Sequence, residues 1–439
     1  MPVQSNAGLA RVIGRWSLAA LMVNAVIGSG VFGLPSDLAK LLGKNAFWAV
    51  LFAAVAVGIV MACLAEVASQ FTQAGGPYLY ARVAFGRFVG IEIGWMLWLT
   101  RLTSPAANAN LFVIYLGEFW PAATHPIPRL CILTALIAAI TFANFRGAKT
   151  GTRMSNIFTV AKLVPLLLVA FAGMFYLAVH HPVLSVGGEG ADAHTWLKAI
   201  LLMVFAYGGF ETGLTPMGEA KDPRRDAAFA LFIALITCTF LYTAIQWVVL
   251  GVLPDPAHSQ RPLADVARII FGPWGAALIA VGAMVSVYGY LSANVLATPR
   301  ITFAMAERGD FPAIFRAVHP KFRTPYFSIL VFAILVWGLA ILGSFTWNVT
   351  LSAVSRLFYY GLGCAALPAL RKKQPGLALF RLPGGVIFSV AGVTVCAVLI
   401  TGVDRSGFRI LLGTAIVAAV NWLLVRKRAP LETLAESSG

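Results

Sequence analysis

Two short runs of residues, each in the middle of an apolar stretch, have the composition of backbone binding sites for a small charged molecule. The first run is Ile27-Gly28-Ser29-Gly30, and the second is Phe205-Ala206-Tyr207-Gly208, with Glu211 three residues after it. Glycine is a poor helix former, so each run predicts a break in a helix. N–H groups freed at a break can hold a carboxylate, and freed carbonyl groups can hold an ammonium.

Close helix packing is the alternative explanation for either run alone, because small residues are common where membrane helices touch. Two glycine-interrupted stretches in corresponding positions of two halves of a chain, however, indicate a midplane binding site. A carboxylate subsite and an ammonium subsite together suit a zwitterionic amino acid. We therefore predict that both runs bind substrate.

Single ionisable residues within apolar stretches are costly in a membrane and indicate function. Lys162 lies in the fifth such stretch, where burial would make it a coupling group that exchanges a proton. The alternative explanation for Lys162 is that its long side chain extends the amine to the membrane surface. Glu211 is predicted to bind the substrate amine or a proton, or alternatively to cap the helix that follows the break. For Arg356 the simpler expectation is an ion pair with a carboxylate inside the bundle.

A polar stripe follows one face of the third apolar stretch. Arg101, Ser104 and Asn108 recur there at helical spacing. The stripe is predicted to line a cavity rather than to face lipid. A cationic side chain beside a binding cavity disfavours a cationic substrate, so a neutral amino acid is expected.

The composition excludes an ordinary soluble protein. Of the 439 residues, 59% are hydrophobic and 11% are charged, whereas soluble domains contain about 25% charged residues. The net charge of +16 would suit nucleic-acid binding, but the basic residues lie in short loops between apolar stretches. The expected partner is therefore the lipid bilayer, with no nucleic acid. No cofactor or metal site is predicted, because the histidines lie outside the apolar stretches and the cysteines form no CxxC pair.

We predict an all-α integral membrane protein in the cell membrane, with twelve transmembrane helices. The expected spans are 17–42, 45–71, 87–117, 129–145, 154–179, 196–217, 228–252, 274–299, 326–343, 346–370, 383–403 and 408–425. Basic residues gather at the N-terminus, in the even-numbered loops and in the tail. Basic loops stay in the cytoplasm, so both termini are predicted to be cytoplasmic.

Four motifs resemble those of the amino acid–polyamine–organocation permeases. Ile27 to Phe32 resembles the first-helix signature of that superfamily, and Phe205 to Arg225 resembles its sixth helix and cytoplasmic end. The segment from Gln73 to Arg82 and the segment from Thr298 to Pro312 resemble two of its cytoplasmic loops. The resemblance covers about residues 20–425.

The resemblance implies a core of two inverted five-helix repeats, as in LeuT-like proteins, with helices 1 and 6 broken. The repeats would span residues 17–179 and 196–370, between a cytoplasmic N-terminal segment, 1–16, and helices 11 and 12 at 383–425 with a cytoplasmic tail, 426–439. Lys162 resembles the lysine that replaces sodium in sodium-independent members. Backbone at Gly28, Ser29 and Gly30 would hold the substrate carboxylate, and backbone around Phe205 to Gly208 the amine. Phe205 would also act as a gating aromatic side chain. Arg101, within the third predicted helix, departs from the commoner pattern of the superfamily.

The resulting hypothesis is a sodium-independent secondary transporter that moves amino acids by alternating access, by proton symport or exchange. Within transport, the alternative is an organic-cation or polyamine carrier, which would lack a carboxylate for the first break. From another class, a membrane-embedded enzyme would need a nucleophile, base and orienting group at depth, and no such set is apparent in the sequence. The protein is therefore predicted not to be an enzyme.

Overall fold

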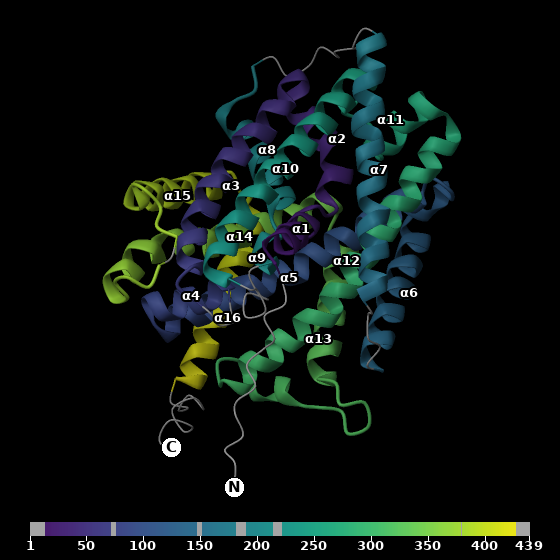
Figure 1. Cartoon of the computed structure of the whole chain (residues 1–439). Coiled ribbons are helices and arrows are strands. Elements are labelled where there is room, and N and C mark those ends of the chain that lie inside the picture. Colours follow the sequence, from purple (N-terminus) through teal and green to yellow (C-terminus); the bar gives the residue numbers. More distant parts are fainter. Residues whose placement is uncertain are drawn as a thin grey trace.

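The computed structural model describes residues 14–71, 76–146, 152–180, 190–213, 222–378 and 380–426, and within them all regular structure is helical (Figure 1). The helices before residue 214 are α1 (Arg15–Val26), α2 (Gly30–Leu42), α3 (Ala46–Ala68), α4 (Gly76–Phe85), α5 (Arg87–Leu116), α6 (Pro126–Phe145), α7 (Thr152–Val179), α8 (Ala193–Tyr207) and α9 (Phe210–Gly213). The later helices are α10 (Pro223–Val252), α11 (Pro262–Phe271), α12 (Pro273–Glu307), α13 (Tyr326–Leu342), α14 (Phe345–Lys373), α15 (Gly385–Ile400) and α16 (Arg405–Val425).

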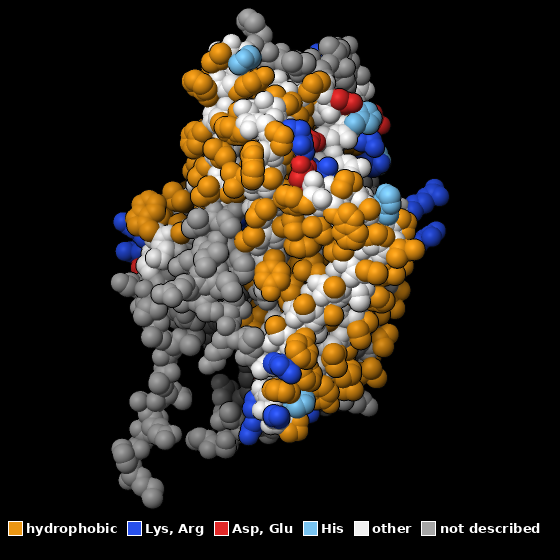
Figure 2. Space-filling model, turned by 90° about the vertical axis from the view of Figure 1, so that its right-hand side faces the viewer, with side chains coloured by type: hydrophobic (Ala, Val, Ile, Leu, Met, Phe, Trp, Pro, Cys, Tyr) orange, Lys and Arg blue, Asp and Glu red, His pale blue; other side chains and the backbone are white. Residues whose placement is uncertain are grey.

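The described helices suit a bilayer. Seven helical stretches are long and apolar enough to cross a hydrocarbon core, and three shorter helices, α8, α13 and α15, are also apolar. Hydrophobic side chains cover most of the described surface in Figure 2. Large apolar side chains that no part of the protein covers include Phe171, Phe175, Phe240, Trp274 and Leu342. Such a surface is stable in lipid, so the protein is a multi-pass membrane protein.

α5 forms the centre of the bundle. It contacts α14, α12, α4, α13 and α16, and Figure 1 shows it running through the middle of the molecule. With 30 residues it is long enough to span a membrane, but it carries Arg87, Glu92 and Arg101 and is not among the seven stretches that composition selects. A helix surrounded by protein rather than lipid tolerates such polar residues.

Each predicted span contains helix, and the first and sixth are each divided in two. The first span is α1 followed by α2, and the sixth is α8 followed by α9, with residues 214–217 outside the described part. The eighth span was predicted to end at Pro299, but α12 continues to Glu307. Apolar residues beyond the proline, such as Met305, pack into a cluster with Trp95 and Phe311, and this burial outweighs the lost backbone donor.

Polar clusters join the helices at their ends. Near the beginning of α5, the buried carboxylate of Asp310 accepts hydrogen bonds from Tyr78, Arg82 and Arg87. Glu66 on α3 accepts two hydrogen bonds from Arg371 on α14, at 2.6 and 2.7 Å. At the other end of α5, Glu118 pairs with Arg261 and Arg268, beside α11.

Candidate functional site

The first interruption lies where the glycines predict it. α1 ends at Val26, Ile27 has an extended backbone, and α2 begins at Gly30. A Cβ added at Gly30 would lie 2.9 Å from the Cα of Ala206 on α8, so this glycine lets the two helices touch. A Cβ at Gly28 would meet only one backbone oxygen, at 3.9 Å. Gly28 therefore has room beside it, while Gly30 is needed for packing.

The second interruption lies directly against the first. α8 ends at Tyr207, Gly208 is extended, and Gly209 adopts φ of +113°, which favours glycine. A Cβ at Gly209 would lie 2.3 Å from the carbonyl oxygen of Ala25 at the end of α1. Together with the contact between Gly30 and Ala206, this brings the two broken helices together at their breaks.

A tyrosine that sequence reasoning did not single out joins the two breaks. The Tyr242 hydroxyl on α10 lies 3.2 Å from the carbonyl oxygen of Val26 and 3.1 Å from that of Ala206. Both carbonyls lie at helix ends, where helical partners are missing. The hydroxyl has one proton, which these two carbonyls share, so Tyr242 links the ends of α1 and α8.

The predicted substrate residues at the breaks are shielded from solvent. Ile27, Ser29, Phe205, Ala206 and Tyr207 are all buried. The Ser29 hydroxyl has no hydrogen-bond partner among the described residues, which is costly in an apolar interior unless a ligand provides one.

The adjoining cavity is small in this conformation. It measures about 10 Å³, is lined by Gly30, Ala206 and Tyr242 among others, and is about the size that holds one water molecule. A larger ligand would enter this cavity only when the helices around the breaks separate.

Lys162 on α7 binds the first break. Its ammonium donates hydrogen bonds to the carbonyl oxygens of Asn24 and Ile27, the second at 2.8 Å. These carbonyls belong to the last turn of α1 and to the unwound segment after it. The side chain thus points into the bundle, so the alternative in which it extends to the membrane surface does not describe this structure.

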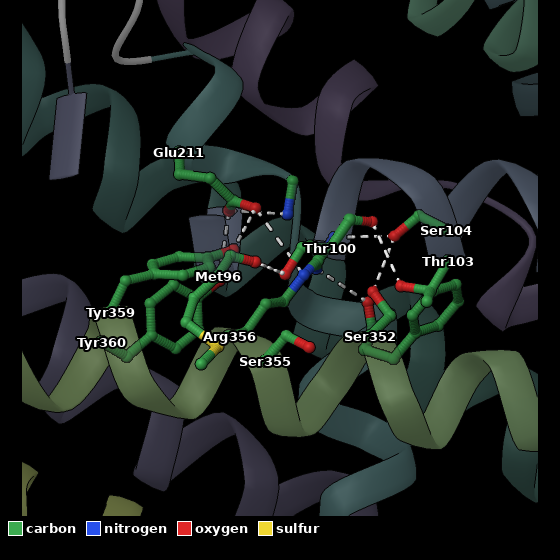
Figure 3. Close-up of polar contacts among 12 residues, drawn as sticks. Met96, Thr100, Thr103, Ser104, Glu211, Ser352, Ser355, Arg356, Tyr359 and Tyr360 are labelled. Carbon is green, nitrogen blue, oxygen red and sulfur yellow. Dashed lines mark hydrogen bonds and ion pairs between the residues drawn. The ribbon is translucent and has the colours of Figure 1, made fainter. Parts of the chain in front are cut away.

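Glu211 on α9 is surrounded by hydrogen-bond donors (Figure 3). The hydroxyls of Tyr359 and Tyr360 donate to its two carboxylate oxygens at 3.0 and 3.1 Å, and the backbone N–H of Gly209 donates at 2.9 Å. An ionised carboxylate only accepts hydrogen bonds, so these donors suit its charged form. The hydrogen bond from Gly209, just before α9, is the kind of contact expected if Glu211 caps that helix.

Arg356 on α14 lies between the sixth-span break and α5. Its Nε is 3.7 Å from a carboxylate oxygen of Glu211, which confirms the expected ion pair with a carboxylate in the bundle. Its other nitrogens donate to the carbonyl oxygen of Phe205 and to the Ser104 hydroxyl, both at 3.4 Å. Sequence reasoning placed the residue within a span but did not connect it with the substrate site.

The polar stripe on α5 faces this cluster. Ser104 shares a 2.7 Å hydrogen bond with Ser352 of α14, and the Asn108 amide donates to the Ser104 carbonyl oxygen. Ser104 and Asn108 are buried, Arg101 is half-buried, and Arg101 lies within electrostatic reach of Glu211. The stripe therefore faces the protein interior rather than lipid, and its lining of a cavity stays a prediction.

Helical spacing is the sequence signal that could have identified the residues of α14 that surround Glu211. Tyr359 and Tyr360 follow Arg356 by three and four residues and so share its face of the helix. Tyr242 gave no comparable signal, because a single tyrosine in an apolar stretch is ordinary.

Residues 13–419 match the amino acid permease family. The chain is 28% identical to the branched-chain amino acid permease of Bacillus subtilis, over 95% of this chain and 91% of that protein. It is also 28% identical to the serine/threonine exchanger of the same organism, over 93% and 95% of the two chains. The arginine/ornithine antiporter of Latilactobacillus sakei is likewise 28% identical, over 74% of this chain and 71% of its own.

The family match covers nearly the whole apolar part of the chain, and these relatives align with it over most of their length. The apolar helical architecture and the two adjoining breaks are consistent with that match. The chain belongs to the amino acid permease family, within the amino acid–polyamine–organocation superfamily.

Proposed function

We propose that this protein is a secondary active transporter that moves amino acids across the cell membrane by alternating access, independently of sodium. The observation that carries the proposal is the pair of adjoining helix breaks with Lys162 bound to one of them. Backbone at Gly28, Ser29 and Gly30 binds the substrate carboxylate, and the unpartnered Ser29 hydroxyl supports a polar ligand there. Backbone from Phe205 to Gly208 binds the amine.

Lys162 supports sodium independence. A sodium ion at the first break would need several oxygen ligands, and the lysine ammonium already binds the carbonyl oxygens of Asn24 and Ile27. A fixed cation there also repels a second cation. Coupling is then by proton symport or by exchange, and the exchanger and antiporter among the relatives support the second route.

The proposed architecture is twelve spans, with two inverted five-helix repeats at 17–179 and 196–370, two peripheral helices at 383–425, and both termini in the cytoplasm. The helix bounds and the equivalent positions of the two breaks support it. The proposed substrate is a neutral amino acid. A polyamine carrier is disfavoured, because Lys162, Arg101 and Arg356 place cationic groups around the breaks.

Uptake by proteoliposomes tests the function. Purified protein should accumulate radiolabelled neutral amino acids equally with sodium or choline outside. A pH gradient that stimulates uptake would identify proton symport, whereas a requirement for internal amino acid would identify exchange. Absence of uptake for a complete amino-acid panel, with protein that is folded and inserted, would refute the proposal.

A further inference from the structure

Arg356 occupies a position that a cationic ligand could otherwise take. Its guanidinium contacts a carboxylate oxygen of Glu211 and the carbonyl oxygen of Phe205, both at the sixth-span break. It also lies over the Phe205 ring, 5.6 Å from the ring centre. A carboxylate, a free carbonyl and an aromatic face are together the groups that bind a guanidinium or ammonium.

The backbone at the break is shaped to admit this side chain. A Cβ added at Gly208 would lie 1.1 Å from a terminal nitrogen of Arg356, so only glycine leaves room for the guanidinium there. Both charged side chains are almost completely buried, with 5% of Arg356 and 3% of Glu211 exposed. Two buried charges in contact compensate each other, and removal of one leaves the other unpaired.

We propose that Arg356 is a specificity-determining residue whose guanidinium fills, from within the protein, the place that a cationic substrate side chain would take beside Glu211. Cationic amino acids are thereby excluded, and neutral ones are admitted. This inference rests on the proposed function and deepens it, since it assigns the charge preference to one residue. Arg101, which the sequence suggested for this role, lies near the same carboxylate and adds to the repulsion.

The test is a gain of function. Proteoliposomes would carry the wild type, Arg356→Ala, Arg356→Lys, and Arg356→Ala combined with Glu211→Gln, and lysine and arginine would compete with uptake of a radiolabelled neutral amino acid. In the wild type, cationic amino acids should inhibit at least tenfold more weakly than neutral ones. In Arg356→Ala they should inhibit at least tenfold more strongly than in the wild type, because Glu211 then lacks its cation.

Two controls separate this effect from general damage. The double variant has no unpaired carboxylate and should lose the gain, and Arg356→Lys should keep the exclusion. Arg371→Ala disrupts a different buried pair, with Glu66, and should gain no affinity for cations. Arg356→Gln keeps an amide donor for the Phe205 carbonyl and repeats the experiment should Arg356→Ala fail to fold.

Thermal unfolding in detergent provides a readout that does not need transport. Millimolar methylguanidinium should raise the Tm of Arg356→Ala but not that of the wild type or the double variant. Lysine inhibition of the wild type as strong as that by neutral amino acids would overturn the inference. So would a folded Arg356→Ala or Arg356→Gln that neither binds cationic amino acids nor is stabilised. Failure of all uptake by the wild type would refute the proposed function, while the Tm comparison still tests the cation position.

Discussion

Gly208 has no side chain, and this allows α14 to approach the end of α8 closely. The absence of a side chain there lets Arg356 of α14 reach the carbonyl oxygen of Phe205 on α8. Gly28, in the equivalent break of the first span, has open space beside it instead. Similar glycine-rich motifs thus have different roles, one in close packing around an arginine and the other in leaving backbone accessible.

Gly208→Ala should therefore displace the guanidinium and impair transport. We expect a loss of about 1–3 kcal/mol in stability, typical of overpacking, and at least a tenfold fall in uptake of neutral amino acids. Gly28→Ala is the matched control and should leave the Tm of the folded protein nearly unchanged. Measurement of Tm and uptake for both variants checks this, and equal Tm values for the two would contradict the assignment.

Lys162 is the residue that we propose for coupling. Its bonds to the carbonyls of Asn24 and Ile27 tie α7 to the first break, and a change of its protonation would weaken them and shift the balance of outward and inward states. Lys162→Ala should lower the maximal uptake rate at least tenfold, change KM less, and flatten the pH profile of uptake.

The exposed Lys198 at the start of α8 gives the control variant, Lys198→Ala, which should transport like the wild type. Loss of activity in Lys162→Ala with an unaltered pH profile would show that this lysine only connects α7 to the first break and does not exchange a proton. A strict sodium requirement in the wild type would contradict the role altogether.

At the scale of elements, the two broken helices are held as one unit. Gly30 lets α2 pack on α8, Gly209 lets α9 pack on α1, and Tyr242 of α10 binds a carbonyl from each break. Backbone groups at a break are costly in a membrane unless they are satisfied. The single proton of the tyrosine hydroxyl is shared between these two carbonyls, so the side chain links the two breaks.

Tyr242→Phe should loosen this unit without removing apolar packing. Loss of the shared hydroxyl hydrogen bond should cost about 0.5–1.5 kcal/mol, seen as a lower Tm. Uptake should slow because the breaks are less well ordered. Tyr176→Phe on α7, whose ring stacks on His180 away from the breaks, is the control. A Tm for Tyr242→Phe that matches the wild type would show that the hydroxyl contributes nothing.

At the scale of the whole molecule, the charged clusters and the apolar surface define how the protein sits in a bilayer. The ion pairs of Asp310 with Arg82 and Arg87 lie at one end of α5, and those of Glu118 with Arg261 and Arg268 lie at the other. Apolar side chains cover most of the described surface that Figure 2 shows. The basic loops predict that the Asp310 end faces the cytoplasm.

Cysteine labelling tests this orientation. In a variant without the native cysteines, Asn6→Cys and Leu434→Cys should both resist an impermeant thiol reagent in intact cells and react after permeabilisation. Both positions lie outside the described residues, so the prediction rests on loop charge alone. A cysteine introduced in the loop before α11, at the exposed Gln260, should react from outside as the positive control. Labelling of both termini in intact cells would refute the cytoplasmic orientation, and labelling of one terminus alone would refute an even number of spans.

Much of this architecture followed from the sequence. The apolar stretches predicted the helices because hydrophobic length is a local property, and the glycine runs placed the breaks because helix propensity is also local. The predicted end of the eighth span at residue 299 was too early for the helix, because the packing of Met305 in a cluster with Trp95 is not a local property. Helical spacing also puts Ser104 and Asn108 on one face, and both are buried in the structure rather than exposed to lipid.

Only the tertiary structure decided which residues from different helices meet. Glu211 and Tyr359 are separated by 148 positions, and Arg356 and Phe205 by 151, and no periodicity in one helix specifies such a pair. The contacts depend on how α5, α8, α9 and α14 cross, and on Gly208 being small enough for the crossing. The residues of a helical face are thus readable from spacing along the chain, whereas their partners are set by the packing of whole helices, which is a property of the folded molecule.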